Sequence, residues 1–502
     1  MRSIWFLVGL LLGAGAAQAS ITPQSPPQTI SSDIAASLRG KLVQSAILAR
    51  QGQLGAAAAM LDSIVNSDGF MLLPEPERYL ALTLDGTIAL ENGRYDAAHG
   101  LLVQASHYDE ADDAVWSARL RAAFVLYNYR DAALCVATLS RRWPGSMESV
   151  RSNAIYAIQR ELAKHGNDAE SLDMLQALFD LKWTDEDGEP SGLWRELARL
   201  LIDKGDLSRA KAVATRIRSA RVALSMRVDK RFDPITQAAP QAFDVDRLMT
   251  AEIAEAQTRM KATPGLLEPR VHLINLLLST REYGRALALA DEAIEKVQGS
   301  QDAKPYLDFD EQYIWLLNAR SDVLEGLGRW DEAAVQLARA TRRPENGELN
   351  VSQAINLASL YDSLGRPDKA LDAVAEVGPL SDFGRMQLEG VKLRAFLQNG
   401  DAAAAAKSVA YLREHRIDAI ATWQNALLAQ GDIDAAADVM VERLDNPRWR
   451  SDALVAAQEY ADVPMTPVKQ KIDALRQAML KRPRVQAALA KVGRVERFRF
   501  AP

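Results

Sequence analysis

Residues that could perform acid–base chemistry occur in three acidic runs of the sequence. The runs are YDEADD (108–113), TDEDGE (184–189) and DFDE (308–311). Two carboxylates at a suitable separation can act as general acid and general base. In a chain whose pattern is helical almost throughout, however, such runs are typical of helix N-termini and of solvated faces. We therefore predict no catalytic carboxylate pair.

Nucleophilic, metal and phosphate chemistry have equally little support. The five histidines are scattered, and none belongs to an H-E-x-x-H zinc motif. The chain has no G-x-x-x-x-G-K-[ST] phosphate loop and no G-x-S-x-G nucleophile elbow. Cys135, the one cysteine, lies on an apolar helical stripe in DAALCVATL, which indicates a small buried hydrophobic residue. The sequence thus predicts a protein that is not an enzyme, with no catalytic residue, no metal site and no cofactor.

Composition and charge limit the class of protein further. The 502 residues are 48% hydrophobic and 25% charged, with a formal net charge of -6. This suits a large helical protein with an ample core. The acidic balance gives no reason to expect nucleic acid or an anionic membrane surface as a partner. Because one cysteine cannot form an internal disulfide, stability must come from packing.

The first residues have the pattern of a secretory signal peptide. MRSIWFLVGLLLGAGAAQAS contains Arg2, an apolar run, and an A-x-A cleavage site ahead of Ser20. An uncleaved anchor is the alternative, but the run is short for a membrane span and is diluted by Gly and Ala. We predict that residues 1–19 are removed and that residues 20–33, rich in Pro, Ser and Thr, form a disordered tether.

This N-terminus also predicts the location of the protein. A lipoprotein would need a cysteine at the position of Ser20. No later segment is long and apolar enough to cross a bilayer. We therefore expect a periplasmic protein that is not lipid-anchored and has no membrane span in its mature part.

From about Ile34 onward the helical pattern repeats as hairpins. NLASLYDSLGRPDKALDAVAEV (356–377) has one apolar stripe on each side of Gly365. A glycine at this place can take the left-handed conformation that ends a helix. Two looser copies of the turn have Asn128 and Arg281 in place of the glycine. The turn recurs at Gly52, Gly93, Gly166, Gly205, Gly328, Gly400 and Gly431.

The spacing of these turns is regular. Successive turns lie 31 to 47 residues apart, except for one interval of 76 that predicts a degenerate copy near 219–265. Aspartates that directly follow three of the glycines are predicted to cap the second helix of their hairpin. Five residues after each turn comes a small residue, which allows two helices to approach closely. The small residues are Ala57, Ala98, Ala133, Ser171, Ala210, Ala286, Ala333, Ala370, Ala405 and Ala436.

These units resemble tetratricopeptide repeats (TPRs), as found in exported bacterial TPR proteins. The resemblance is clearest in WRELARLLIDKGDLSRAKAVATRI (194–217), through Trp194, Leu197, Ala198 and Leu201 on its first helix. It covers roughly residues 34–446. It implies an all-α solenoid, a superhelix of about ten helical hairpins in which each hairpin is covered by its neighbours, with a helical C-terminal cap.

The resemblance also implies a concave groove lined by the first helices. Three candidate groove residues from two adjacent repeats, Arg160, Arg195 and Arg199, could form a patch that seeks carboxylates. Asparagines further along could hydrogen-bond the backbone of an extended peptide. The alternative is that all of these are ordinary solvated helix residues. The later candidates are Asn275, Asn318, Asp322, Arg394 and Asn425.

Two irregular stretches suggest how the chain is divided. We predict an N-terminal TPR-like lobe over 34–231, an irregular linker with two prolines over 232–246, and a C-terminal lobe over 247–446. Residues 447–502 are predicted to form the cap and tail, with helices near 451–461 and 467–492. In the tail, RVERFRF (494–500) alternates like a strand. It could add to the sheet edge of a partner, or its phenylalanines could tuck against the cap.

The sequence therefore predicts a non-catalytic periplasmic scaffold or adaptor that binds a protein or peptide partner of the cell envelope. Exported proteins of this kind often serve envelope assembly, polysaccharide export or secretion. Two alternatives stay open. One is a peptidoglycan-acting enzyme like the superhelical lytic transglycosylases, although no separate globular catalytic domain is evident. The other is a peptide- or glycan-binding protein, in which Trp315 and Tyr156 could stack on sugar rings.

Overall fold

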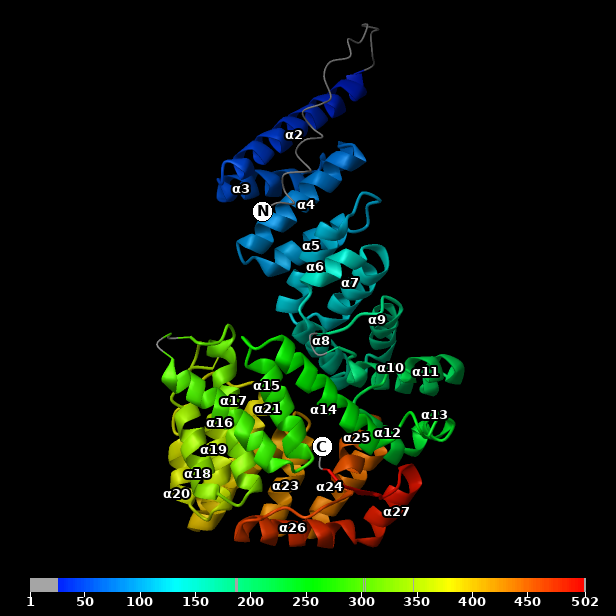
Figure 1. The fold of residues 1–502 in the computed structure, drawn as a ribbon. Helices are drawn as coiled ribbons and strands as arrows, with labels where there is room; N and C mark the ends of the chain where they lie inside the picture. Colours follow the sequence, from blue (N-terminus) through cyan, green and yellow to red (C-terminus); the bar gives the residue numbers. More distant parts are fainter. Residues whose placement is uncertain (1–25, 186–187, 301, 303, 346, 501–502) are drawn as a thin grey trace. The chain divides into compact units, whose positions relative to one another are not determined.

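The computed structural model describes residues 26–185, 188–300, 302, 304–345 and 347–500. Regular structure in these residues is helical apart from two very short strands, so the predicted all-α class is confirmed (Figure 1). The chain divides into two compact parts, residues 1–213 and 214–502, which we call unit 1 and unit 2. The predicted signal peptide, 1–19, lies outside the described residues.

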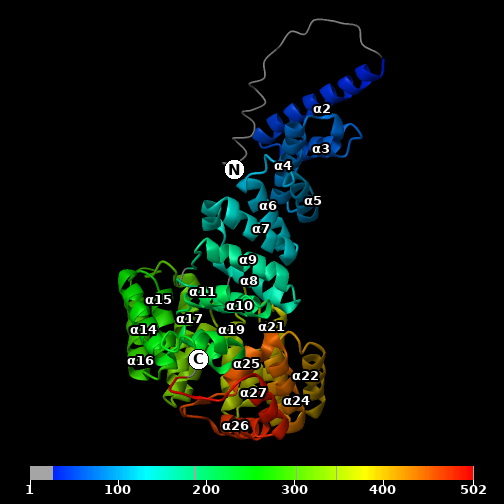
Figure 2. The same cartoon turned by 90° about the vertical axis from the view of Figure 1, so that its right-hand side faces the viewer.

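Unit 1 is a row of helical hairpins in chain order (Figure 2). The helices from α2 to α10 pack mainly on helices next to them or next but one in the sequence, as α4 does with α5 and α6. Two 3₁₀ helices, η2 (Phe70–Leu72) and η3 (Pro144–Ser149), join successive hairpins. The helices are α2 (Pro26–Arg50), α3 (Leu54–Val65), α4 (Glu75–Glu91), α5 (Tyr95–Ala105), α6 (Asp113–Val125), α7 (Tyr129–Arg142), α8 (Ser152–Lys164), α9 (Asp168–Asp180), α10 (Ser191–Asp203) and α11 (Leu207–Ala214).

Unit 2 continues the hairpins and ends in a cap. An irregular stretch with η4 (Lys230–Phe232) and α13 (Asp233–Thr236) separates its first two long helices, which pack on each other. The repeat helices are α12 (Ala220–Val228), α14 (Val245–Ala262), α15 (Glu268–Ser279), α16 (Tyr283–Gly299), α17 (Phe309–Gly326), α18 (Trp330–Ala340), α19 (Ser352–Ser363), α20 (Pro367–Ala373), α21 (Asp382–Asn399), α22 (Ala402–Glu414), α23 (Ile420–Ala429) and α24 (Ile433–Asp445). The cap contains α25 (Pro447–Ala456), α26 (Pro467–Leu480), α27 (Pro483–Val492), β1 (Glu459–Tyr460) and β2 (Arg497–Phe498).

The turns within the hairpins confirm the predicted role of glycine. All eight predicted turn glycines have φ between 68° and 80°, which side chains with a Cβ rarely adopt. Arg281, from one of the looser copies, also has a positive φ of 63°. The other looser copy was placed one residue too late, because Tyr127 has the positive φ, of 57°. Asn128 instead caps α7 by accepting a hydrogen bond from the Asp131 backbone N–H at 3.3 Å.

The predicted packing of each hairpin is also confirmed. None of the ten small residues that follow the turns is more than 4% exposed. The three predicted aspartate caps are present as well. Asp206, Asp401 and Asp432 accept hydrogen bonds from backbone N–H groups three residues on, at 3.1, 2.9 and 3.0 Å. Short side chains at the contact and satisfied helix ends together explain why the same hairpin recurs.

The boundaries of the parts differ from those that the sequence suggested. The division falls at Val213–Ala214, whereas the prolines suggested a linker over 232–246. In that stretch Pro234 lies in the first turn of α13, where a missing N–H costs nothing, and Phe243 is buried. Of the predicted tether, 20–33, residues 20–25 lie outside the described residues, and the rest belongs to α2, which begins at Pro26. Prolines at a helix start are compatible with helix, so they do not mark disorder by themselves.

The cap closes unit 2 by returning to its beginning. α25 packs on α12, and the backbone of Gly493 forms a bridge with Asp229. A Cβ at Gly493 would come within 2.5 Å of the Val228 carbonyl oxygen, so only glycine permits this approach. Arg494 then donates its backbone N–H to that carbonyl at 3.0 Å. The last part of the chain thus covers the first helix of the unit.

The tail is held in this position by charge and by burial. Both carboxylate oxygens of Asp233 accept hydrogen bonds from Arg494 at 2.7 Å, and Arg227 pairs with Glu496 at 2.6 Å. β2 pairs in parallel with β1. Phe498 and Phe500 are 7% and 2% exposed. Of the two interpretations of RVERFRF, the structure shows the one in which the phenylalanines tuck against the cap.

Candidate functional site

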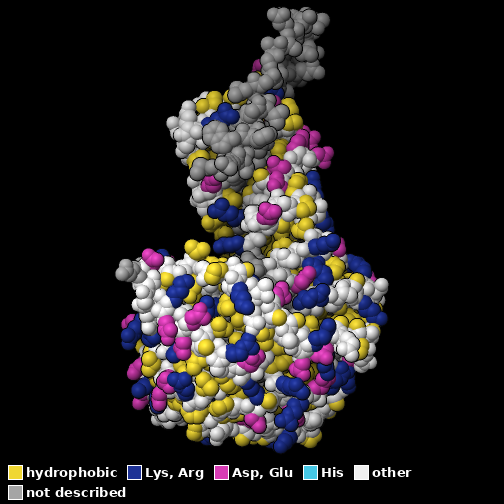
Figure 3. Space-filling model, viewed as in Figure 1, with side chains coloured by type: hydrophobic (Ala, Val, Ile, Leu, Met, Phe, Trp, Pro, Cys, Tyr) yellow, Lys and Arg dark blue, Asp and Glu magenta, His cyan; other side chains and the backbone are white. Residues whose placement is uncertain are grey.

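On the face of unit 2 that Figure 3 shows, basic and acidic side chains alternate with apolar ones. Within the described residues no helix combines the length and apolarity needed to cross a membrane. These residues also contain no group of three or more His, Cys, Asp or Glu side chains suited to a metal ion.

Cys135 is placed as predicted, within the core of unit 1. It is fully buried, and burial raises the pKa of its thiol far above the ordinary value. The neighbouring carboxylate of Asp131 accepts hydrogen bonds from Arg119 Nε and from the His99 ring, both at 2.9 Å. A thiol that stays protonated in such surroundings is a poor nucleophile.

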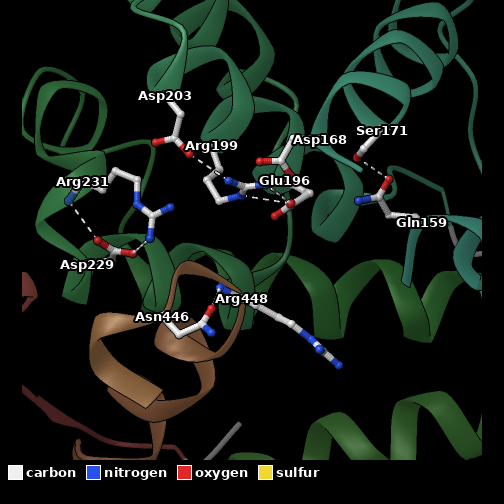
Figure 4. A network of polar contacts seen from close by, with 10 residues as sticks. All are labelled: Gln159, Asp168, Ser171, Glu196, Arg199, Asp203, Asp229, Arg231, Asn446 and Arg448. Carbon is white, nitrogen blue, oxygen red and sulfur yellow. Dashed lines mark hydrogen bonds and ion pairs between the residues drawn. The ribbon is translucent and has the colours of Figure 1, made fainter. Parts of the chain in front are cut away.

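The arginines predicted for the groove of unit 1 are on α8 and α10. Arg199 is 12% exposed, and its guanidinium is held by three carboxylates (Figure 4). These are Glu196 at 2.7 Å, Asp203 at 2.8 Å and Asp168 at 3.1 Å. Burial alone would lower the pKa of Arg199, but the carboxylates outweigh it and raise the pKa. The arginine therefore ties α10 to the start of α9.

The other two arginines have different surroundings. Arg160 is 72% exposed, and the Glu161 carboxylate lies 3.5 Å from its Nε. Arg195 is half-buried on α10. Gln159, beside Arg160, is buried and accepts a hydrogen bond from Ser171 Oγ at 2.8 Å, also seen in Figure 4. A carboxylate-binding patch made of all three arginines stays a prediction, and Arg199 would have to release its present partners to join it.

The polar candidates of unit 2 form a ladder across adjacent hairpins. Asn318 on α17 donates to Asp322 Oδ2 at 2.9 Å and accepts from Asn356 on α19 at 2.8 Å. Burial, with a smaller contribution from the Glu325 carboxylate, raises the pKa of Asp322 to about 7. The structure thus brings two of the predicted residues together with Asn356, which the sequence analysis did not select.

The remaining candidates lie on the helices to either side. Arg394 on α21 donates to Asp362 Oδ2 at 2.5 Å and to Ser359 Oγ at 3.4 Å. Burial raises the pKa of Asp362, and the charge of Arg394 opposes this rise. Asn275 on α15 and Asn425 on α23 are exposed. Those two amides are therefore accessible to a ligand.

Next to this ladder lies an open, largely apolar pocket of about 600 Å³. It is formed by the first helices of three successive hairpins, α17, α19 and α21, and by the loop before α19. Three large apolar side chains in it are well exposed, which is unusual for a folded chain. They are Trp315 at 37%, Leu349 at 60% and Phe383 at 59%. Asn356 and Gln387 supply polar groups to its wall.

Satisfied backbone groups hold the walls of this apolar pocket. Glu345 accepts hydrogen bonds from the backbone N–H groups of Val351 and Ser352 at 2.9 and 2.8 Å, and so fixes the start of α19. Burial alone would raise the pKa of Glu345, but these bonds and the Ser352 hydroxyl lower it. At the rim, a Cβ on Gly378 would come within 2.2 Å of the Leu349 carbonyl oxygen. Glycine therefore allows the two loops to meet.

The cap contacts two of the helices that line the apolar pocket. Lys469 on α26 pairs with Glu325 near the end of α17 at 2.7 Å. Helix α26 also packs on α19 and α23, and Arg281 donates to the Ala461 carbonyl oxygen. Part of the surface of α17 and α19 is therefore taken by the chain itself, while the apolar pocket stays open.

One residue of this pocket, Trp315, was predicted from the sequence as a side chain that could stack on sugar rings. Leu349 and Phe383 were not predicted. The sequence did contain a signal for Phe383. This residue directly follows Ser381 and Asp382, which start α21, and an apolar side chain at such a helix start stays exposed unless a loop covers it. Leu349 gave no such signal, because its exposure depends on the path of the loop 344–351.

Comparisons with known proteins found similarity to solved structures only. No protein-family model matches the chain, and no curated protein matches it. Among solved structures, the APC/C hetero-tetramer Cut9–Hcn1 is 13% identical, covers 91% of this chain and 90% of its own, and has a TM-score of 0.28. The TPR domain of P58(IPK) is 14% identical, with 89% and 100% covered and a TM-score of 0.21. Yeast Tom70 is 13% identical, with 83% and 100% covered and a TM-score of 0.20. Sequence identities and TM-scores this low do not support any function for this chain. Its fold is established by its own helices.

Proposed function

We propose that this chain is a non-catalytic scaffold whose unit 2 holds a segment of a protein partner in the apolar pocket formed by α17, α19 and α21. The observation that carries the proposal is the exposure of Trp315, Leu349 and Phe383 around one open pocket. Exposed apolar side chains that gather at one place mark an interaction site. The ladder of Asn356 and Asn318 beside it supplies polar groups that can fix the register of a bound segment.

The pocket suits a helix or an extended segment with one or two large apolar side chains. A pocket of about 600 Å³ holds a few such side chains but not a folded domain. The partner would therefore insert an anchor while the rim makes polar contacts. We place this activity in the periplasm, after removal of residues 1–19, and in assembly or export at the cell envelope.

Photo-crosslinking in cells that produce the protein naturally tests the proposal. A benzophenone side chain at position 383 is expected to give one defined adduct, and Trp315→Ala in the same chain should abolish it. The matched control places the benzophenone at Val335, which is 57% exposed on α18 outside the pocket. Identical adducts from positions 383 and 335, or none from 383, would refute the proposed site. N-terminal sequencing of the purified mature protein tests the location, with Ser20 expected as its first residue.

A further inference from the structure

Unit 2 contains a second pocket, whose lining is basic rather than apolar. This pocket has a volume of about 490 Å³. Tyr313 and Leu317 of α17 form one wall, and the end of α18 with the loop that follows it forms the other. The second wall consists of Arg339, Arg342, Arg343 and Pro344.

The three arginines of this basic pocket, Arg339, Arg342 and Arg343, form no ion pair with an Asp or Glu oxygen of the described residues. Arg339 donates a long hydrogen bond, of 3.4 Å, to the Gln336 side chain. Other arginines of the same unit are paired, such as Arg320 with Asp291 at 2.6 Å. Three unneutralised cations around one cavity create a local positive potential.

Aromatic rings fix one of these arginines in place. The Arg343 guanidinium lies 4.6 Å from the centre of the Tyr313 ring and 5.2 Å from that of Phe309. These two rings are stacked on each other at 4.8 Å. A guanidinium held over a ring keeps its N–H groups available at the edge. Arg343 is thus oriented before any anion arrives.

Two acidic residues that are close in the sequence to the lining of the basic pocket are engaged elsewhere. The Glu345 carboxylate holds the backbone N–H groups at the start of α19. The Asp308 carboxylate, which precedes the stacked rings, accepts hydrogen bonds from the backbone N–H groups of Leu267 and Glu268, both at 2.8 Å. A cation near the last turn of α18 would complement the helix dipole. That effect does not account for three arginines arranged around a cavity.

We propose that this basic pocket binds a small polyanion that carries at least two phosphate or carboxylate groups. Guanidinium groups bind both kinds of oxyanion through paired N–H donors, and three positive charges match a ligand of two to four negative charges. The site is separate from the apolar pocket, and binding there does not depend on the proposed scaffold function.

Calorimetric titration of the mature protein at low ionic strength tests this inference. Inorganic pyrophosphate is the probe in one arm and citrate in the other, which distinguishes phosphate from carboxylate ligands. We expect at least one of them to bind with a Kd below about 1 mM, and binding to weaken steeply as salt is added. Arg339→Gln/Arg342→Gln/Arg343→Gln should weaken it at least tenfold.

A matched control removes the same charge from paired arginines of unit 2. It is Arg285→Gln/Arg329→Gln/Arg366→Gln, whose residues pair with Glu282, Glu332 and Asp331. This control should bind within about twofold of the parent chain. Arg342→Gln alone, at an exposed position, should still weaken binding if the triple variant does not fold. Equal losses in both triple variants, or no binding of either anion to the parent, would overturn the proposal. Trp315→Ala, in the apolar pocket, should leave anion binding unchanged. Failure of the scaffold proposal can therefore be told apart from failure of this one.

Discussion

Unit 1 and unit 2 are built from the same kind of hairpin but differ in how contacts are distributed along the chain. In unit 1 the main contacts of α2 to α10 are with helices no more than two places away in the sequence. In unit 2 the cap adds contacts between α12 and α25, and between α19 and α26. An array of nearest-neighbour contacts can lose structure piece by piece, whereas a closed array loses it as a whole. An array of the same repeats can thus unfold piece by piece or as a whole, depending on whether a cap closes it.

Removing the tail that helps to close unit 2 should cause the largest loss of unfolding free energy. Deletion of residues 494–502 exposes the surface covered by Phe498 and Phe500 and removes the Arg494–Asp233 pair. Burial of each aromatic side chain contributes about 1.5 to 3 kcal/mol, so we expect unit 2 to lose about 4 to 6 kcal/mol of unfolding free energy. Hydrogen exchange measured by mass spectrometry should show faster exchange throughout unit 2 and no change in unit 1. The control is Val495→Ala, a 43% exposed tail position, with an expected loss below about 0.5 kcal/mol. Equal acceleration in both units would contradict the comparison.

A core substitution in unit 1 should act locally. Trp194 is fully buried and meets Phe179 edge to face at 5.3 Å. Trp194→Ala should cost about 3 to 5 kcal/mol through lost burial and a cavity. The loss of protection against exchange should be confined to α8–α11 and leave α2–α5 as before. Trp315→Ala in unit 2, where the side chain is 37% exposed, serves as the matched control and should cost less than about 1 kcal/mol. Loss of protection over all of unit 1 would show that it, too, unfolds as a whole.

Part of the pH dependence of unit 2 should come from the Asp322 carboxyl, one of several carboxyls in the unit whose pKa is raised by burial. The folded-state pKa of Asp322, about 7, lies above its ordinary value of 3.8. Between these values the folded chain binds more protons than the unfolded chain, so the unfolding free energy of unit 2 falls as pH rises from about 4 to about 7. Asp322→Asn should remove a fall on the order of 1 to 2 kcal/mol, given partial solvent screening.

Chemical denaturation at pH 5 and at pH 7.5 measures this effect of Asp322. The control is Asp372→Asn, at an exposed position of the same unit, which should keep the pH dependence of the parent chain. If Asp322→Asn and the parent lose the same stability between the two pH values, another group is responsible.

The smallest expected change in stability concerns two turns that lack glycine. Tyr127 in unit 1 and Arg281 in unit 2 both have positive φ, which costs a side chain about 1 kcal/mol. Tyr127→Gly should therefore stabilise unit 1 by up to about 1 kcal/mol in denaturant titrations, since its side chain is 77% exposed. Arg281→Gly should not stabilise unit 2, because the substitution also removes the bond to the Ala461 carbonyl that holds the cap. A similar gain at both positions would mean that this bond contributes little.

Local structure was predictable from the sequence to a large extent. Glycines at the turns and small residues five places later determine the hairpin through backbone conformation and close packing. Both kinds of residue can be recognised in the sequence. The closure was not predictable, because it depends on which distant surface the last residues meet. Most of the apolar pocket and all of the basic pocket were missed for a related reason. Leu349 and Arg342 lie between α18 and α19, and their exposure follows from how that connection packs rather than from a sequence pattern.

The return of the tail to α12 also affects when unit 2 can finish folding. Residues 227–233 bond to residues 490–496, which come 260 to 269 positions later. At translation rates of about 5 to 20 residues per second, the ribosome needs on the order of 10 to 50 s to make the intervening chain. The hairpins of unit 1 need only their neighbours in the sequence, but the face of α12 that the cap contacts stays uncovered until residues 490–496 are present. A chain that stops before these residues keeps that face open to proteases.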